Sequence, residues 1–249
     1  MNVTSIIITK NEEKNIVDCM ESVSFSNQII VVDNDSSDRT VELAKRQGAD
    51  VISDKFSDFS KQREAGIKHV KCDWILYLDA DERITQTLRG EIEKVIMGIS
   101  SADVYKIKRR NYYFGKHEWY YYGQIERLFK KDSLKGWFGE IHESPVFTGK
   151  LGELNGFIDH YTHTDLTSMV SKTIKWSDTE ADIRLLANHP KMSWWRFPRV
   201  MIGSFLTYFV KQKGYKAGTA GLVESIFQSY STFITYAKLW EMQNNNIRS

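Results

Sequence analysis

The sequence predicts an α/β fold in which a mostly parallel central sheet is flanked by helices. In residues 2–100, short apolar runs rich in β-branched residues alternate with segments whose apolar residues recur at helical spacing. Strands and helices that alternate in this way form parallel sheets covered on both faces. From Leu166 onward the helical spacing continues, which predicts a C-terminal helical extension.

Four strands and three helices follow one another in the first part of the chain. The strands are predicted at residues 3–9, 28–33, 49–54 and 73–79. The helices are predicted at residues 11–23, 41–48 and 59–70. Residues 34–40, NDSSDRT, combine turn formers with N-cap residues, so the second helix is expected to begin directly after them.

The composition fits a globular protein of the cytoplasm. Apolar residues make up 41% of the chain and the formal net charge is +2, which excludes a disordered chain and a broad nucleic-acid-binding surface. Cys19 and Cys72 lie far apart without metal-ligand spacing, as expected in a reducing compartment. The first apolar run is short and lacks a preceding basic region, so no signal peptide is expected.

The C-terminal part contains an aromatic and basic stretch, residues 196–216, that is too short to span a bilayer. Such a helix can lie on a membrane surface among anionic headgroups. Its apolar residues can equally pack against the rest of the chain or against a second subunit. Peripheral membrane contact and a homo-oligomer therefore both stay open.

Three polar clusters, TKNEE, DNDSSD and DADE, follow three of the predicted strands. Ligands of open α/β sheets bind at the carboxyl ends of the strands, so the clusters are expected to converge on one rim. Asp79 and Asp81 are separated by one residue and can face a single ligand. Oxygen ligands suit Mg²⁺ or Mn²⁺, although an isolated DxD is more often a solvated turn. By alternation, Glu82 is expected to point elsewhere and to serve the next helix.

Further polar residues are candidates for catalysis and binding. In GEIHESP, Glu140 and Glu143 are candidate general bases, unless this is only a polar loop. Asp33 and Asn34 can bond a nucleobase edge or a ribose. His160 is a candidate ligand or supporting residue. The chain has neither GxGxxG nor GxxxxGK[ST], so dinucleotide binding and P-loop hydrolysis are not expected.

The ordered segments SIIITKNEE, IIVVDNDSSDRT, ADVI, KQREAGI and DWILYLDADERI resemble the family 2 glycosyltransferases with a GT-A fold. RRNYYFGK, ERLFKK, IHES, DHYTH and YAKLWE resemble a smaller bacterial subgroup that includes lipopolysaccharide-core β-glucosyltransferases. The resemblance implies an inverting enzyme that uses a nucleotide-diphospho-sugar, with UDP-glucose favoured, and a saccharide or lipid-linked acceptor. It also implies a divalent metal, Mn²⁺ or Mg²⁺.

The resemblance assigns roles to residues and ranges. A catalytic domain would occupy residues 1–165, with a nucleotide-sugar-binding half at 1–104 and an acceptor half at 105–165, followed by the extension at 166–249. The implied donor-binding residues are Thr9, Asn11, Glu12, Asp33, Asn34, Asp79 and Arg127. The metal ligands would be Asp81 and Asp79, with His160 in support, and Glu143 falls at the position of the general base.

The chain departs from the family pattern at two motifs. DNDS stands where many members have DDGS, and HE stands where many have ED. The QxxRW motif of processive synthases is absent, which favours transfer of a single sugar. A sugar nucleotidyltransferase, a haloacid-dehalogenase-type phosphatase and a non-catalytic carbohydrate-binding protein are the alternatives. The first lacks its Gly-rich loop here, the second its DxDx[TV] pattern, and the third leaves the acidic clusters unexplained.

Overall fold

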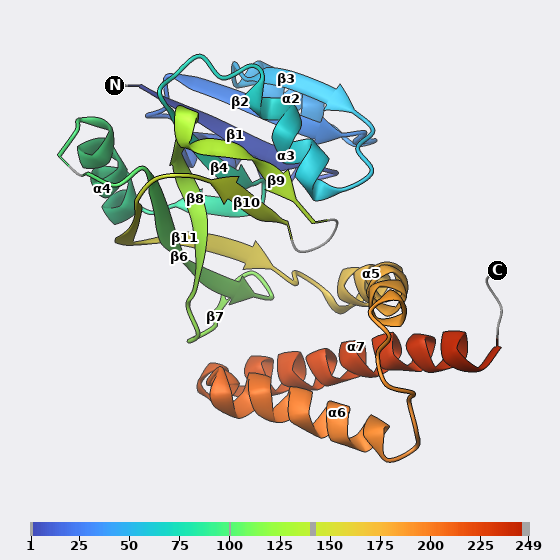
Figure 1. Cartoon of the computed structure of the whole chain (residues 1–249). Helices are drawn as coiled ribbons and strands as arrows, with labels where there is room; N and C mark the ends of the chain where they lie inside the picture. The colour runs from blue at the N-terminus through green and yellow to red at the C-terminus, as the bar shows by residue number, and fades with distance from the viewer. Residues whose placement is uncertain (1, 100, 140–142, 246–249) are drawn as a thin grey trace. The chain divides into compact units, whose positions relative to one another are not determined.

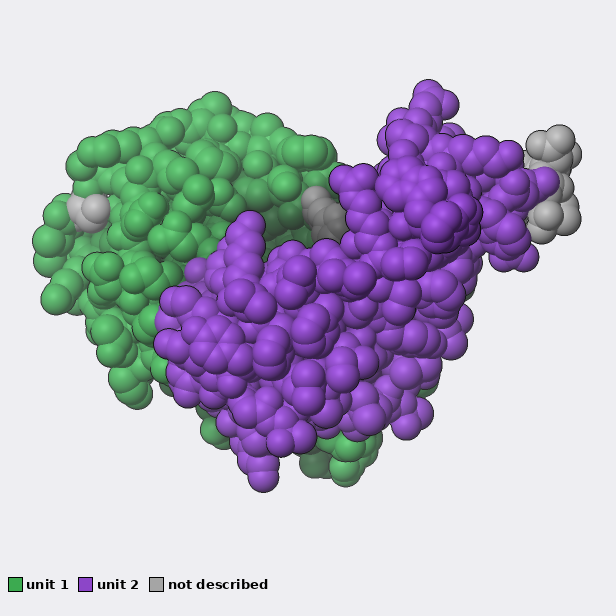
Figure 2. All heavy atoms as spheres, turned by 90° about the horizontal axis from the view of Figure 1, so that it is seen from below, with its two compact units in different colours: residues 1–110, 123–160 green, residues 111–122, 161–249 purple. Residues whose placement is uncertain are grey.

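The structure is a computed structural model that describes residues 2–99, 101–139 and 143–245. Nine strands of the described chain form one sheet in the order β3-β2-β1-β4-β8-β6-β11-β5, with β7 paired to β6 (Figure 1). The chain divides into two compact units, coloured separately in Figure 2. The first holds residues 1–110 and 123–160, and the second holds residues 111–122 and 161–249.

The parallel half of the sheet centres on β1 (Val3–Thr9), which is buried along its whole length. It lies between β2 (Gln28–Asn34) and β4 (Trp74–Asp79), and β3 (Asp50–Asp54) pairs with β2. All four strands were predicted to within a residue at most ends. Because both faces of these strands are covered, their sequences are nearly continuous runs of β-branched and aliphatic residues.

Helices cover both faces of the parallel strands. Alternate strand residues, such as Ile7 and Leu78, pack with α1 (Ile16–Ser22), α2 (Thr40–Arg46) and α4 (Gln86–Ile96). The residues between them pack with α3 (Phe59–Ile67) and with the small sheet of β9 (Leu134–Phe138) and β10 (Ser144–Phe147). Successive side chains of a strand point to opposite faces of the sheet, so the strands contribute to two hydrophobic cores, one on each face.

Helix α1 begins five residues later than the spacing predicts. Asn11 has a positive φ of 54°, which ends the extended backbone of β1. The backbone N–H groups of Asn15 and Ile16 both donate to the carbonyl of Glu12, at 2.9 Å. These bonds form a turn, so Asn11 and Glu12 lie in a loop rather than in a helix.

The second half of the sheet is antiparallel. β8 (Gly123–Lys130) pairs with β4 and with β6 (Val104–Tyr113), and β7 (His117–Glu118) pairs with β6. A short strand that was not predicted, β5 (Glu82–Ile84), pairs with β11 (Leu151–Thr162). This pairing sets His160 directly opposite Glu82, beside the end of β4.

The second unit contains the predicted C-terminal helices. They are α5 (Leu166–Leu186), α6 (Arg196–Leu206) with the π-helical turn η2 (Thr207–Lys211), the 3-10 turn η3 (Gly214–Ala217) and α7 (Gly218–Asn245). α7 contacts both α5 and α6. None of the helices in the described residues is long and apolar enough to cross a membrane.

Candidate active site

The carboxyl ends of β1, β2 and β4 meet at one rim, as the polar clusters predicted. Thr9 pairs with Asp33 and Ile8 pairs with Asp79 across neighbouring strands. The buried amide of Gln62, on α3, donates to the carbonyls of Thr9 and Val32 at 3.0 and 2.8 Å. Thr9 Oγ1 is buried and has no hydrogen-bond partner among the described residues.

The loops after β1 and β2 hold one another in place. Asp33 is buried, and its carboxylate accepts from the N–H and the hydroxyl of Ser36 at 3.0 and 2.5 Å. Ser36 Oγ also accepts the N–H of Asn11 at 2.7 Å, and Glu12 N–H donates to Thr40 Oγ1 at 2.8 Å. Because backbone N–H groups of the first loop donate to side chains that follow β2, the two loops hold each other in place and form a preorganised wall of the rim.

Asn34 is placed differently from Asp33. Its Oδ1 accepts the backbone N–H of Phe56 at 3.0 Å, so the side chain anchors the chain that follows β3. The residue that stands where many family members carry a carboxylate therefore has a clear local contact in this protein.

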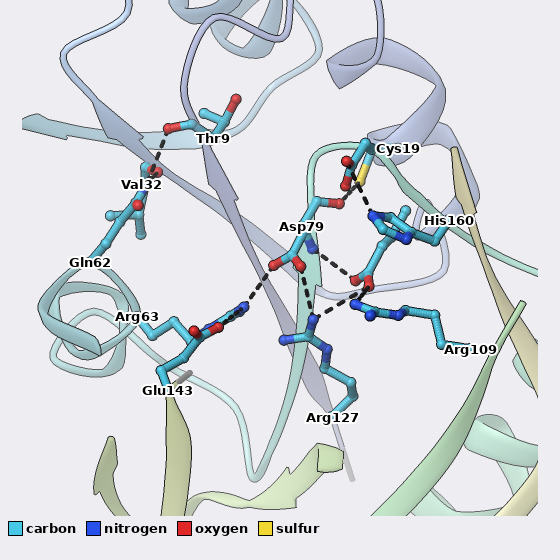
Figure 3. A network of polar contacts seen from close by, with 12 residues as sticks. Thr9, Cys19, Val32, Gln62, Arg63, Asp79, Arg109, Arg127, Glu143 and His160 are labelled. Carbon is cyan, nitrogen blue, oxygen red and sulfur yellow. Dashed lines mark hydrogen bonds and ion pairs between the residues drawn. The ribbon is translucent and has the colours of Figure 1, made fainter. Parts of the chain in front are cut away.

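Asp79 lies between two buried arginines (Figure 3). Arg63 Nη2 donates to Asp79 Oδ1 at 2.7 Å, and Arg127 Nη2 donates to Asp79 Oδ2 at 2.9 Å. Burial alone would raise the pKa of Asp79, but the charges of Arg127 and Arg63 outweigh it and hold that pKa well below its usual range. Burial also lowers the pKa of Arg127, yet Asp79 and Glu82 more than compensate and raise it. Asp79 and Arg127 therefore both carry their charges at neutral pH.

Arg63 also joins Asp79 to Glu143. Its Nε and Nη2 donate to Glu143 Oε1 at 3.0 and 2.7 Å. The guanidinium is 1% exposed and lies over the ring of Trp137, 5.0 Å from the centroid. No role was predicted for Arg63 or Gln62. A usable signal was present, because both lie on the same side of α3 as Gly66, where apolar side chains are expected.

Glu82 lies inside the network, so the expectation that it points away and serves the next helix is wrong. It is fully buried, its Oε2 accepts the backbone N–H of Asp79 at 2.9 Å, and Oε1 lies 3.3 Å from Arg127 Nη2. Thr85 caps α4 instead. The chain turns at residues 80–81 before β5 begins, and simple alternation does not hold across a turn.

Asp81 pairs with His160 rather than with an arginine, at 3.3 Å between Oδ2 and Nε2. Burial lowers the pKa of His160, but the charge of Asp81 and its hydrogen bond outweigh burial and raise that pKa. Asp81 Oδ1 is buried without a partner among the described residues. Nearby, Cys19 Sγ donates to the carbonyl of Asp79 at 3.5 Å, and burial raises the pKa of this thiol, so it stays neutral.

Comparison with known proteins decides the family. The family model of glycosyl transferase family 2 matches residues 4–150, which include Arg63, Asp79, Glu82, Arg127 and Glu143 but not His160. The chain belongs to glycosyl transferase family 2.

Relatives of this family 2 enzyme match it over nearly its whole length. An uncharacterized glycosyltransferase of Rickettsia prowazekii is 32% identical over 255 residues, covering 96% of this chain and 87% of that protein. A lipopolysaccharide core biosynthesis glycosyltransferase of Rhizobium meliloti is 23% identical, covering 96% and 92%. The crystal structure of S. aureus TarS 1-349 in complex with UDP-GlcNAc shares the fold, with a TM-score of 0.50, 12% identity and coverage of 99% and 92%. The GT-A fold is confirmed.

The acidic side chains that the structure describes do not form a closed metal cage in this family 2 enzyme. Within the described part of the chain, no three His, Cys, Asp or Glu side chains are grouped so that they could hold a metal ion. Both oxygens of Asp79 accept from arginines. Asp81 Oδ1 has no partner among the described residues and is an oxygen ligand of the kind that Mg²⁺ and Mn²⁺ bind. The described residues therefore fit a metal site in which Asp81 is the protein ligand and the other coordination positions are open.

The GEIHESP and DHYTH motifs of this enzyme contain three further polar residues. Glu140 and His142 lie outside the described residues. His163, of the DHYTH motif, pairs through Nδ1 with the buried Glu224 of α7 at 2.9 Å. That contact lies within the second unit, and His163 therefore has a structural partner of its own.

A shallow polar hollow of about 520 Å³ lies at the opposite ends of the strands. It is lined by residues at the amino ends of β1 and β2, among them Asn27 and Gln28. Ligands of parallel α/β sheets bind at the carboxyl ends. The network around Asp79, and not this hollow, is the candidate active site.

Proposed function

We propose that the protein is an inverting glycosyltransferase that moves one sugar from a nucleotide-diphospho-sugar to a saccharide or lipid-linked acceptor in cell-envelope glycan synthesis. The observation that carries the proposal is the chain of contacts Asp79–Arg63–Glu143 at the carboxyl ends of the strands. The Rhizobium meliloti relative supports an envelope glycan as the product. UDP as the nucleotide is supported by the fold relative that binds UDP-GlcNAc, and glucose by the sequence resemblance.

The donor nucleotide would lie along the rim formed by the loops after β1 and β2. Thr9 Oγ1, which has no partner among the described residues, is available to a ligand. Asp33 would receive the base or ribose, because a buried carboxylate fixed by Ser36 offers oriented acceptors. Asn11, Glu12 and Asn34 would shape the same wall through their loop contacts.

The diphosphate would bind at Asp79, Asp81 and Arg127. A divalent cation would be held by Asp81 Oδ1, next to Asp79, whose oxygens accept from two arginines. His160 would hold the other oxygen of Asp81, as second-sphere histidines and carboxylates do. When bound, such a cation neutralises the charge that develops on a leaving phosphate. Arg127 contributes a permanent positive charge at the same place, which would stabilise the charge of the phosphates.

Glu143 would act as the general base. In the reaction, the acceptor hydroxyl gives its proton to the Glu143 carboxylate while its oxygen forms a bond to the anomeric carbon. The bond from that carbon to the diphosphate oxygen breaks, and its electron pair leaves with the nucleoside diphosphate. Attack opposite the leaving group inverts the configuration. Arg63 would position Glu143 by two hydrogen bonds, and Glu140 is the competing base.

We also propose a division of labour along the chain. Residues 1–165 would form the catalytic domain, with residues 1–104 binding the donor and residues 105–165 binding the acceptor. The aromatic residues of the second range suit sugar rings, whose C–H faces stack on π-systems. Residues 166–249 would form the helical extension.

The test compares two variants with the wild-type enzyme. Glu143→Gln should leave UDP-glucose affinity, measured by calorimetry, nearly unchanged and should slow sugar transfer by about 10²–10⁴-fold, which is the usual contribution of a general base. Glu140→Gln serves as the matched control and should change transfer far less. A larger loss for Glu140→Gln would move the role of base to Glu140, and equal, small losses for both would contradict a carboxylate base in this loop.

A further inference from the structure

The positive charge of the chain is concentrated in one segment. Residues 183–223 contain seven Lys and Arg residues and no Asp or Glu, whereas the whole chain has a formal charge of only +2. Arg184, at the edge of the segment, pairs with Glu180. Lys211, Lys213 and Lys216 are exposed. The segment lies within the second unit and contains α6, η2 and η3.

One side of α6 is occupied by α7, and the two helices run alongside each other (Figure 1). Phe197 packs edge-to-face on Phe233, with centroids 5.9 Å apart. Further along, the carbonyl of Met201 accepts from Ser229 Oγ at 2.8 Å, and Ser204 Oγ donates to the carbonyl of Gln228 at 3.2 Å. These positions recur at helical spacing and define the inner side of α6.

The opposite side of α6 is apolar and exposed. Ile202, Leu206 and Val210 recur every four residues, and 58%, 50% and 55% of their surfaces are exposed. At about 100° per residue, Ile202 and Leu206 each lie about 160° from Ser204, and Val210 follows them in η2. Arg199, also exposed, shares this outer side. Three large aliphatic side chains in a row on the exposed side of a helix are uncommon in soluble proteins and indicate an interaction surface.

Aromatic and basic residues lie at both ends of this stripe. Trp194 and Trp195 precede α6, and Trp194 is 83% exposed. The guanidinium groups of Arg196 and Arg199 lie 5.3 and 5.9 Å from the centroid of the Trp195 ring. Lys211 of η2 and Lys216 of η3 lie at the other end of the stripe. Tryptophan and basic residues around an apolar stripe are typical of helices that lie in a membrane interface.

We propose that the outer side of α6 and η2, defined by Arg199, Ile202, Leu206 and Val210, binds the surface of an anionic lipid bilayer. The absence of acidic residues over 183–223 matches anionic headgroups, which attract clusters of four to eight basic residues. A second copy of the chain fits this surface poorly, because a two-fold contact would bring two strongly basic segments together. This inference does not depend on the proposed activity.

The experiment is co-sedimentation of the full chain with vesicles of phosphatidylcholine, with and without phosphatidylglycerol. The wild-type protein should bind the anionic vesicles and release at high salt. The double variant Ile202→Glu, Leu206→Glu should bind at least tenfold more weakly, because it removes two apolar anchors and adds two negative charges. Lys211→Ala with Lys213→Ala should weaken binding by about 25-fold, at about fivefold per base.

A matched control uses two other exposed aliphatic residues of the same unit. Ile174 and Ile183 on α5 have similar exposure, and Ile174→Glu with Ile183→Glu should bind vesicles like the wild type. Circular dichroism confirms that each variant is folded. Equal vesicle binding by the α6 and α5 variants would overturn the proposal. So would a wild-type protein that ignores anionic vesicles but forms a dimer that the α6 variant abolishes in sedimentation equilibrium.

Discussion

Arg63 is the side chain on which the candidate site depends most, so its replacement gives a strong test. In Arg63→Met, a side chain of similar length keeps much of the contact with Trp137 but removes three hydrogen bonds of 2.7–3.0 Å to Asp79 and Glu143. Breaking a buried ion pair by removing one partner costs about 3–5 kcal/mol. Asp79 retains Arg127, and Glu143 is 17% exposed and can recover water. The loss should therefore lie near the lower limit, about 3 kcal/mol.

The assay is urea unfolding followed by circular dichroism, at pH 7. Arg46→Met is the control, because Arg46 forms an exposed pair with Glu42 and such pairs contribute about 0.3–0.5 kcal/mol. Glu143→Gln should cost less than Arg63→Met, because Arg63 keeps Asp79 as a partner. If Arg63→Met lowers the free energy of unfolding by less than about 1 kcal/mol, the reasoning is refuted, because Asp79 and Glu143 would then not depend on Arg63 for their stability.

Three further predictions concern packing and pH. Gly66→Ala should destabilise the protein by about 1–3 kcal/mol in thermal unfolding, because the new Cβ would lie 2.8 Å from Ile6 Cγ2. The control, Gly90→Ala, adds a Cβ that meets nothing within 4 Å and should be neutral or stabilising. A larger loss of stability in Gly90→Ala than in Gly66→Ala would contradict the packing of α3. Asp58 caps α3 and has its pKa lowered to about 2, because hydrogen bonds from Ser60 and Lys61 outweigh burial. Its contribution is therefore complete above about pH 4 and should be lost as the pH falls to about 2; Asp58→Asn should flatten this part of the pH–stability curve, and an unchanged curve would exclude the effect. Because the pKa of His160 is raised, its contribution to folding stability is complete below about pH 6.5 and should decline as the pH rises above that value. His160→Gln should remove this decline, and NMR titration of the ring would locate it.

The parallel half of the fold and the rim of the site follow directly from the sequence. Apolar β-branched runs define β1 to β4, and the register of parallel strands then brings Thr9, Asp33 and Asp79 together. The same reasoning does not place Arg63 at the site. Its position on the inner side of α3 signals burial, but it does not identify the partners, because Asp79 and Glu143 lie 16 and 80 residues away.

The error at Glu82 has a local cause. Alternation applies along a strand, whereas the chain turns at residues 80–81 and enters β5. β5 itself is only three residues long and exists because β11 pairs with it. Short strands of this kind depend on a distant partner, so the segment alone gives no signal. The contact between Asp81 and His160 arises from the same pairing.

The anomeric form of the sugar released from UDP-glucose tests the central claim most directly. Without an acceptor, water can take the place of the acceptor hydroxyl, and early time points in proton NMR distinguish α- from β-glucose. With Mn²⁺, the proposed inverting site should release UDP and β-glucose, and Asp81→Ala should release neither. Early α-glucose would contradict inversion at Glu143, and release of glucose 1-phosphate in the presence of pyrophosphate would instead indicate a sugar nucleotidyltransferase.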